Sequence, residues 1–101
     1  MGLQIVTKKR FINSLQRTTV YLKKEWNQKV VEDFKQLVFI KIELLSFQPN
    51  IGSDTLIKNI KSVIVGKGYQ NRMYYKVEKN KLVIIDLKDT RKDPKQNRYS
   101  K

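Results

Sequence analysis

The first half of the chain spaces its hydrophobic residues with the period of a helix. A short apolar segment, Leu3 to Thr7, predicts a strand, and apolar residues then recur at helical spacing between Lys8 and Trp26. A second helix is expected to begin after Asn27, whose side chain suits an N-cap, and to end near Phe47, because Pro49 disfavours helix at the residue before it. The link between the helices is short, which predicts an antiparallel hairpin with Trp26 as a core anchor at its turn.

The second half has the pattern of β-strands. Two segments rich in Ile and Val, Leu56–Val65 and Leu82–Leu87, predict strands, and the second is apolar enough to be a central strand buried on both faces. Between them, Arg72–Glu78 alternates apolar and polar residues as a strand does. Lys79 and Asn80 predict a tight turn, with Asn80 in the left-handed conformation.

The order of these elements (β-α-α-β-β-β) predicts an α+β fold with two layers. The helical hairpin is expected to cover one face of a sheet. The last three strands are expected to form an antiparallel meander, with the first strand beside them. Residues 1–101 are expected to form one domain, which ends in a loose basic tail from about residue 92.

Charge narrows the class of partner. The chain has 22 Lys and Arg against 9 Asp and Glu, a net charge of +13. A small domain needs a net charge of only about 2–8 for solubility. The excess predicts a polyanionic partner, either nucleic acid, a ribosome, an acidic protein or an anionic membrane.

The residue types that are missing narrow the chemistry. Cysteine and histidine are both absent, which excludes disulfides, Cys- or His-ligated metals and imidazole acid–base catalysis. We therefore expect neither a metal nor a small-molecule cofactor. No signal peptide and no apolar run of about 18 residues is present, so a soluble cytoplasmic protein with no membrane partner is expected.

Four segments of the chain resemble toxins of the RelE/ParE superfamily. In order, they are Leu44-Leu45 with Pro49, Ile51 and Gly52; Ile57 to Val65; Asn71 to Val77; and Ile84 to Leu87 with Asp89 to Pro94. They are similar to the family's leucines followed by P-x-x-G, its strand before a basic loop, its N-R-hydrophobic-Y-Y-R/K-V strand, and its last strand with a D-T-R-x-x-P ending. Together they span most of the chain.

The resemblance implies a toxin that arrests growth and is paired with a cognate antitoxin, as in plasmid stabilisation modules. RelE-like members cut mRNA in the ribosomal A site, whereas ParE-like members inhibit DNA gyrase and are not nucleases. From the sequence we place ribosome-dependent mRNA cleavage first, with ribosome and mRNA as partners, and gyrase inhibition second. A nucleic-acid-binding protein without toxicity is a third reading. The antitoxin is expected to supply an acidic, partly disordered segment that covers the basic groove.

The resemblance also implies candidate site residues. Those that fit a metal-independent nuclease are Arg72, Arg91, Lys58, Lys61 and Tyr99; those that would contact nucleic acid are Lys67, Tyr69, Lys76 and Lys92. Lysine can act as a base only if its pKa is lowered, and arginine can stabilise the charge of the transition state.

Each candidate also has a structural interpretation. Lys58 and Lys61 suit a solvated strand face. Arg72 and Arg91 suit ion pairs with Asp86 or Asp89.

The tyrosines divide in the same way. Tyr75, in line with its apolar neighbours on the strand, is predicted to be core. Tyr74, on the opposite face, is free in this prediction to stack on a base. Tyr69 and Tyr99 are predicted to be exposed.

Overall fold

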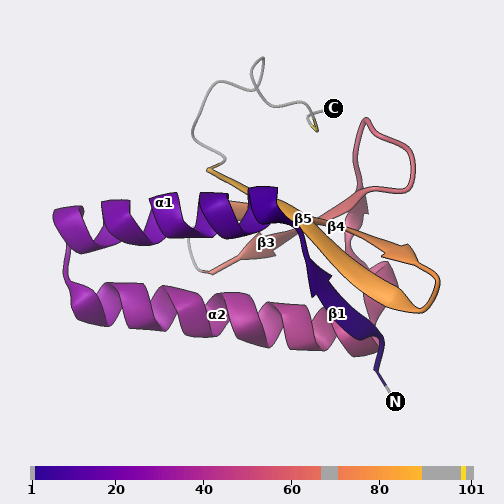
Figure 1. The fold of residues 1–101 in the computed structure, drawn as a ribbon, viewed down its shortest axis with the longest axis horizontal. Helices are drawn as coiled ribbons and strands as arrows, with labels where there is room; N and C mark the ends of the chain where they lie inside the picture. The colour runs from indigo at the N-terminus through magenta and orange to yellow at the C-terminus, as the bar shows by residue number, and fades with distance from the viewer. Residues whose placement is uncertain (1, 67–70, 90–98, 100–101) are drawn as a thin grey trace.

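Two antiparallel helices pack against a five-stranded sheet (Figure 1). The computed structural model describes residues 2–66, 71–89 and 99. Its elements are β1 (Gln4–Thr7), α1 (Lys9–Glu25), α2 (Gln28–Phe47), a 3-10 turn η1 (Pro49–Ile51), β2 (Ser53–Asp54), β3 (Lys61–Val65), β4 (Asn71–Glu78) and β5 (Lys81–Asp89). The predicted α+β class and element order are confirmed. The two-residue strand β2 is an addition that the sequence pattern does not predict.

The sheet is mixed, in the order β1-β5-β4-β3-β2. The predicted meander is confirmed, because β3, β4 and β5 pair antiparallel. β1 instead pairs parallel with β5, from Gln4 opposite Lys81 to Thr7 opposite Ile84. β5 therefore lies between two strands, and its Leu82 and Ile84 are completely buried, as predicted for a central strand.

The helical hairpin forms as predicted except at Trp26. The Asn27 side chain caps α2 by accepting a hydrogen bond of 3.0 Å from the Val30 amide. Trp26, predicted to be a core anchor, is 69% exposed, so that prediction is wrong. Figure 1 shows the reason, because the closed end of the hairpin projects beyond the sheet and none of the described strands reaches it to cover the ring.

The core lies between α2 and the sheet. Helix α2 contributes Phe34, Val38, Ile42 and Leu45, a spacing that places all four on one side of the helix. The residues that meet them are Phe11 of α1 and, from the sheet, Val63, Val65, Met73, Tyr75, Leu82, Ile84 and Leu87.

Tyr75 links this core to the turn after α2. Its side chain is fully buried, as predicted. Its hydroxyl donates to the Pro49 carbonyl at 2.7 Å and accepts from the Gly52 amide at 3.0 Å. A Cβ at Gly52 would overlap the Tyr75 hydroxyl. The P-x-x-G segment therefore fits the turn because both of its ends bind one phenol.

The predicted strand Leu56–Val65 is wrong in its first half. β3 begins only at Lys61, and Lys58 lies in a turn. Asn59 has a φ of 70°, which a strand does not allow. The Thr55 hydroxyl holds this loop together, because it accepts from the Ile57 amide at 3.2 Å and donates to the Ile60 carbonyl at 2.9 Å.

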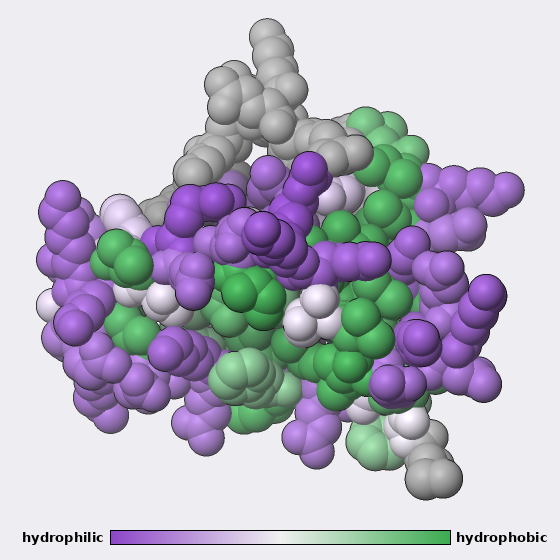
Figure 2. All heavy atoms as spheres, in the orientation of Figure 1, coloured by the Kyte–Doolittle hydropathy of each residue, from purple (hydrophilic) through white to green (hydrophobic). Residues whose placement is uncertain are grey.

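Part of the helical surface remains apolar. Val20 on α1 and Phe39, Ile40 and Phe47 on α2 are each more than half exposed. Figure 2 shows hydrophobic residues in the middle of this view, framed by hydrophilic ones. Neither helix is long and apolar enough to span a bilayer, within the part of the chain that the structure describes.

Candidate functional site

The sheet face turned away from α2 carries the candidate residues of β4. Side chains alternate along a strand, and Met73 and Tyr75 point into the core. Arg72, Tyr74 and Lys76 therefore lie on the opposite face. We call this the distal face. It also includes the strand-paired neighbours of Arg72 and Tyr74, which are Lys88 and Asp86.

A bulge brings Asp86 to the distal face. Tyr75 pairs with Ile84, but Tyr74 pairs with Asp86, which leaves Ile85 as an extra residue in β5. Without the bulge, Asp86 would follow Leu82 and Ile84 into the core. With it, the carboxylate faces away from the core while β5 continues through Leu87, which is buried in the core cluster.

Asp86 joins α1 to the sheet. It is completely buried. Its Oδ1 accepts hydrogen bonds of 2.8 Å from both the Ser14 hydroxyl and the Leu87 amide. Ser14 in turn accepts from Arg17 at 3.1 Å. The Asp86 Oδ2 has no hydrogen-bond partner among the described residues, and the Lys88 Nζ lies 3.8 Å from it.

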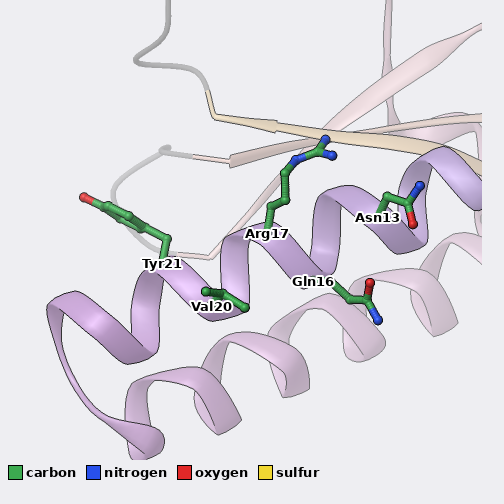
Figure 3. Close-up of a pocket in the computed structure, with 5 residues that line it drawn as sticks. All are labelled: Asn13, Gln16, Arg17, Val20 and Tyr21. Atoms are coloured by element: carbon green, nitrogen blue, oxygen red, sulfur yellow. The ribbon is translucent and has the colours of Figure 1, made fainter.

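Ser14 and Arg17 are site residues that sequence reasoning missed. One feature of the sequence could have indicated them. Ser14 is a polar residue one helical turn after Phe11, on the side of the helix that faces the core. Figure 3 shows Arg17 pointing from α1 toward β5, whereas Gln16 points away from it. Arg17 also lines a shallow hollow of about 470 Å³ along α1, together with Tyr21. The helix therefore adds a cation beside the distal face.

Arg72 is held in place by a neutral partner. Its side chain donates from Nη1 to the Ser62 hydroxyl at 2.9 Å, and it lies opposite Lys88 in the strand register. The pairing with Asp86 that the sequence suggests is not the contact formed, since Asp86 binds Ser14 instead. A guanidinium bound to a hydroxyl keeps its full positive charge on the distal face.

Tyr74 and Tyr99 stack on each other. Their ring centroids are 4.1 Å apart with an interplanar angle of 22°. They are 2% and 3% exposed, so the predictions of an exposed Tyr99 and a free Tyr74 are both wrong. A backbone hydrogen bond of 3.3 Å from the Leu56 amide to the Tyr99 carbonyl holds this residue of the tail against the loop before β3.

The two candidate lysines share a hollow of about 590 Å³ beside Tyr75. Lys58 is exposed, whereas Lys61 forms an ion pair of 2.9 Å with Asp54 of β2. The hydrogen bond to Asp54 raises the pKa of the Lys61 ammonium above its ordinary value. The ion pair therefore holds the Lys61 ammonium beside β2.

The remaining candidates divide into two groups. Lys76 forms an ion pair of 3.0 Å with Glu78, and this contact lowers the pKa of the Glu78 carboxyl. Arg91, Lys67, Tyr69 and Lys92 lie outside the described residues. Within the described part of the chain, no cluster of three acidic residues could hold a metal ion.

Comparison with known families identifies the class of protein. The family model for the ParE toxin of type II toxin–antitoxin systems, parDE, matches residues 5–94. The chain belongs to the ParE toxin family. It is thus a toxin of a type II toxin–antitoxin system, and membership implies an antitoxin partner.

The fold agrees with that assignment. A chain in the solved structure of the chromosomal ParDE toxin–antitoxin system from P. aeruginosa superposes on this toxin with a TM-score of 0.77. The alignment covers 87% of this chain and 96% of the other, at 7% sequence identity. At so low an identity the likeness shows a shared fold. A comparison with curated proteins finds no match.

Proposed function

We propose that this ParE-family toxin arrests growth by binding DNA gyrase and does not cut RNA. The observation that carries the proposal is the ion pair of Lys61. Metal-free RNA cleavage requires a group that removes the proton from the ribose 2′-hydroxyl. A lysine can do so only if its pKa is lowered. Asp54 shifts the pKa of Lys61 in the opposite direction, so the ammonium keeps its proton.

Tyr99 supports the same proposal. A tyrosine that serves RNA cleavage must present its hydroxyl or its ring to the substrate. The Tyr99 ring instead stacks on Tyr74, and the residue is 3% exposed. Gyrase inhibition is the activity that a resemblance to ParE-like members implies, and it requires only a binding surface.

Two assays test the proposal. Purified gyrase should lose its supercoiling activity when the toxin is added and regain it when the antitoxin follows. In cells, induced toxin should trigger a DNA-damage response and leave a reporter mRNA intact by primer extension. Specific cuts in the reporter mRNA, with normal supercoiling, would overturn the proposal.

Ribosome-dependent mRNA cleavage is the second candidate, and Arg72 favours it. Its guanidinium lies on the distal face, fixed by Ser62, and none of the described acidic residues pairs with it. In this case Arg72, together with Arg91, the other arginine that the resemblance suggests, would stabilise the negative charge that develops on the phosphate oxygens in the transition state. Arg72→Ala should then slow mRNA cleavage by about 10²–10³. If gyrase is the target, the reporter mRNA stays uncut with both the wild-type toxin and the Arg72→Ala variant.

We also propose that the antitoxin neutralises the toxin with a segment that is both acidic and apolar. The acidic residues would complement the net charge of +13, and apolar residues would cover Phe39, Ile40 and Phe47. Hydrogen–deuterium exchange on the complex should show slower exchange in α2 and on the distal face. Unchanged exchange in both regions would overturn this interface.

A further inference from the structure

A cationic hollow of about 330 Å³ lies where α1 begins, beside the distal face. Three of its described lining residues are cations, three are isoleucines and one is aromatic: Lys8, Arg10, Lys76, Ile57, Ile60, Ile85 and Tyr99. The lining contains no acidic residue among those described. The hollow thus combines cationic and apolar lining residues. Two of them, Lys76 and Tyr99, are among the candidates that the sequence suggests, whereas Lys8 and Arg10 are not.

Hydrogen bonds hold the walls of the hollow in place. The Lys8 amide donates to the Ile84 carbonyl at 2.9 Å, which fixes the start of α1 beside Ile85. The Thr55 hydroxyl closes the loop that carries Ile57 and Ile60. A site whose walls are fixed before the ligand arrives loses less entropy on binding.

The cations of the hollow stand where a helix disfavours them. The N-terminal end of a helix carries partial positive charge and favours acidic residues. The first turn of α1 has no acidic residue, and Lys8 makes no side-chain cap. Sequences depart from local preferences mainly where function requires it. Lys8 and Arg10 are repelled by the positive end of α1. An anion bound in the hollow would contact both side chains and offset that repulsion.

The net charge around the hollow stays positive even when the acidic residue Glu78 is counted. Glu78 pairs with Lys76 at 3.0 Å, and Lys8 also lowers the pKa of the Glu78 carboxyl. Three lining cations against this one carboxylate give a local charge of +2. The surplus comes from Lys8 and Arg10, for which no ion pair is found among the described residues.

We propose that the cationic hollow binds one phosphorylated nucleoside, with its phosphate on Lys8 and Arg10 and its base against the isoleucines. Ligand pockets begin at about 300 Å³, so the hollow suits a single nucleotide. The nucleotide can be free or part of a nucleic-acid strand, since both present the same phosphate and base. The site goes beyond gyrase inhibition and does not depend on it.

Binding to the full-length toxin, separated from its antitoxin, tests the site. The probes are a fluorescent oligoadenylate RNA, adenosine monophosphate and inorganic phosphate, followed by anisotropy and competition at several salt concentrations. Arg10→Ala should weaken RNA binding and reduce the salt dependence of log K by about 0.7, the loss of one phosphate contact on a single strand. Lys9→Ala is the matched control, because Lys9 is an exposed neighbour that is not among the described lining residues.

The source of the ligand follows from the competition. Displacement of the RNA by adenosine monophosphate indicates a free nucleotide, whereas binding of the RNA alone indicates a strand. Equal competition by inorganic phosphate and adenosine monophosphate would overturn the proposal of a nucleotide site, because the hollow would then recognise only an anion. Equal losses in Arg10→Ala and Lys9→Ala would overturn the hollow itself, since the binding would then follow overall charge.

Two further variants separate binding from folding. Glu78→Gln frees Lys76 and should tighten nucleotide binding, which a purely structural role does not predict. Arg10→Glu should raise the melting temperature, because an acid suits the helix start, and should abolish binding. A stable Arg10→Glu chain that binds the nucleotide as well as the wild type would overturn the proposal.

Discussion

Replacing Tyr75 with phenylalanine removes one hydroxyl and two hydrogen bonds. The Pro49 carbonyl loses its donor at 2.7 Å and the Gly52 amide loses its acceptor at 3.0 Å. A net hydrogen bond contributes about 0.5–1.5 kcal/mol, and an unpaired buried group costs about 1–3 kcal/mol. Both backbone groups are only partly buried, so water can replace part of the loss. We expect Tyr75→Phe to lower the free energy of unfolding by about 1–2 kcal/mol.

Thermal unfolding followed by circular dichroism measures this loss. For a domain of this size, 1 kcal/mol corresponds to about 4–8 °C, so the melting temperature should fall by about 4–16 °C. Tyr21→Phe is the control, because Tyr21 is 48% exposed. It should change stability by less than about 0.5 kcal/mol, as surface substitutions do. Equal melting temperatures for Tyr75→Phe and the wild type would refute the role of the hydroxyl.

The pH dependence of the melting temperature, compared between the wild type and Tyr75→Phe, gives a second test. Burial raises the pKa of the Tyr75 phenol above its ordinary value of 10.0. The phenol therefore stabilises the fold fully below about pH 10, and this stability is lost as the pH rises toward its folded-state pKa. The gap in melting temperature between the wild type and Tyr75→Phe should narrow above that pH. A constant gap would show that the phenol does not ionise more readily in the unfolded chain.

Three further substitutions are expected to destabilise the domain, each measurable by urea unfolding. Gly52→Ala places a methyl group against the Tyr75 hydroxyl and should cost about 1–3 kcal/mol; a neutral effect would mean that the turn moves freely. Ser14→Ala removes a donor from the buried Asp86 and should cost about 1–3 kcal/mol; an unchanged free energy of unfolding would argue against the role of this hydrogen bond. Asn27→Ala removes the cap of α2 and should cost about 1 kcal/mol, whereas Asn27→Gly should cost only a few tenths; equal losses would argue against the cap.

The sequence predicts the elements well where one local rule decides them. Asn27 caps a helix through its own side chain, and Pro49 ends one through its own ring. Burial of β5 follows from its continuous apolar run. These features depend on neighbours along the chain, so periodicity and capping preferences are sufficient.

The misses depend on contacts between distant residues. Trp26 has the apolar character of a core residue, but the length of the hairpin relative to the sheet leaves it exposed. Tyr99 is buried because its ring stacks on that of Tyr74, which lies 25 residues earlier in the sequence. The bulge that turns Asp86 toward Ser14 changes strand register, which alternation along a single strand cannot show.

The site was predicted less completely than the fold. The sequence identified Arg72 and Lys61 as cations of the β half, but it could not show that Ser62 holds one and Asp54 the other. The proton state of a lysine depends on such partners, and so does the choice between a base and a fixed charge.

The parallel pairing of β1 with β5 has a consequence for the toxin during its synthesis. Gln4 lies opposite Lys81, so β1 pairs with β5, a strand that leaves the ribosome much later. Contacts between residues so far apart in sequence slow folding, because a long loop must close before they form. A nascent chain that has exposed both helices still lacks β5, and with it the partner of Ser14. The sheet can therefore close only after β5, Lys81–Asp89, has been translated.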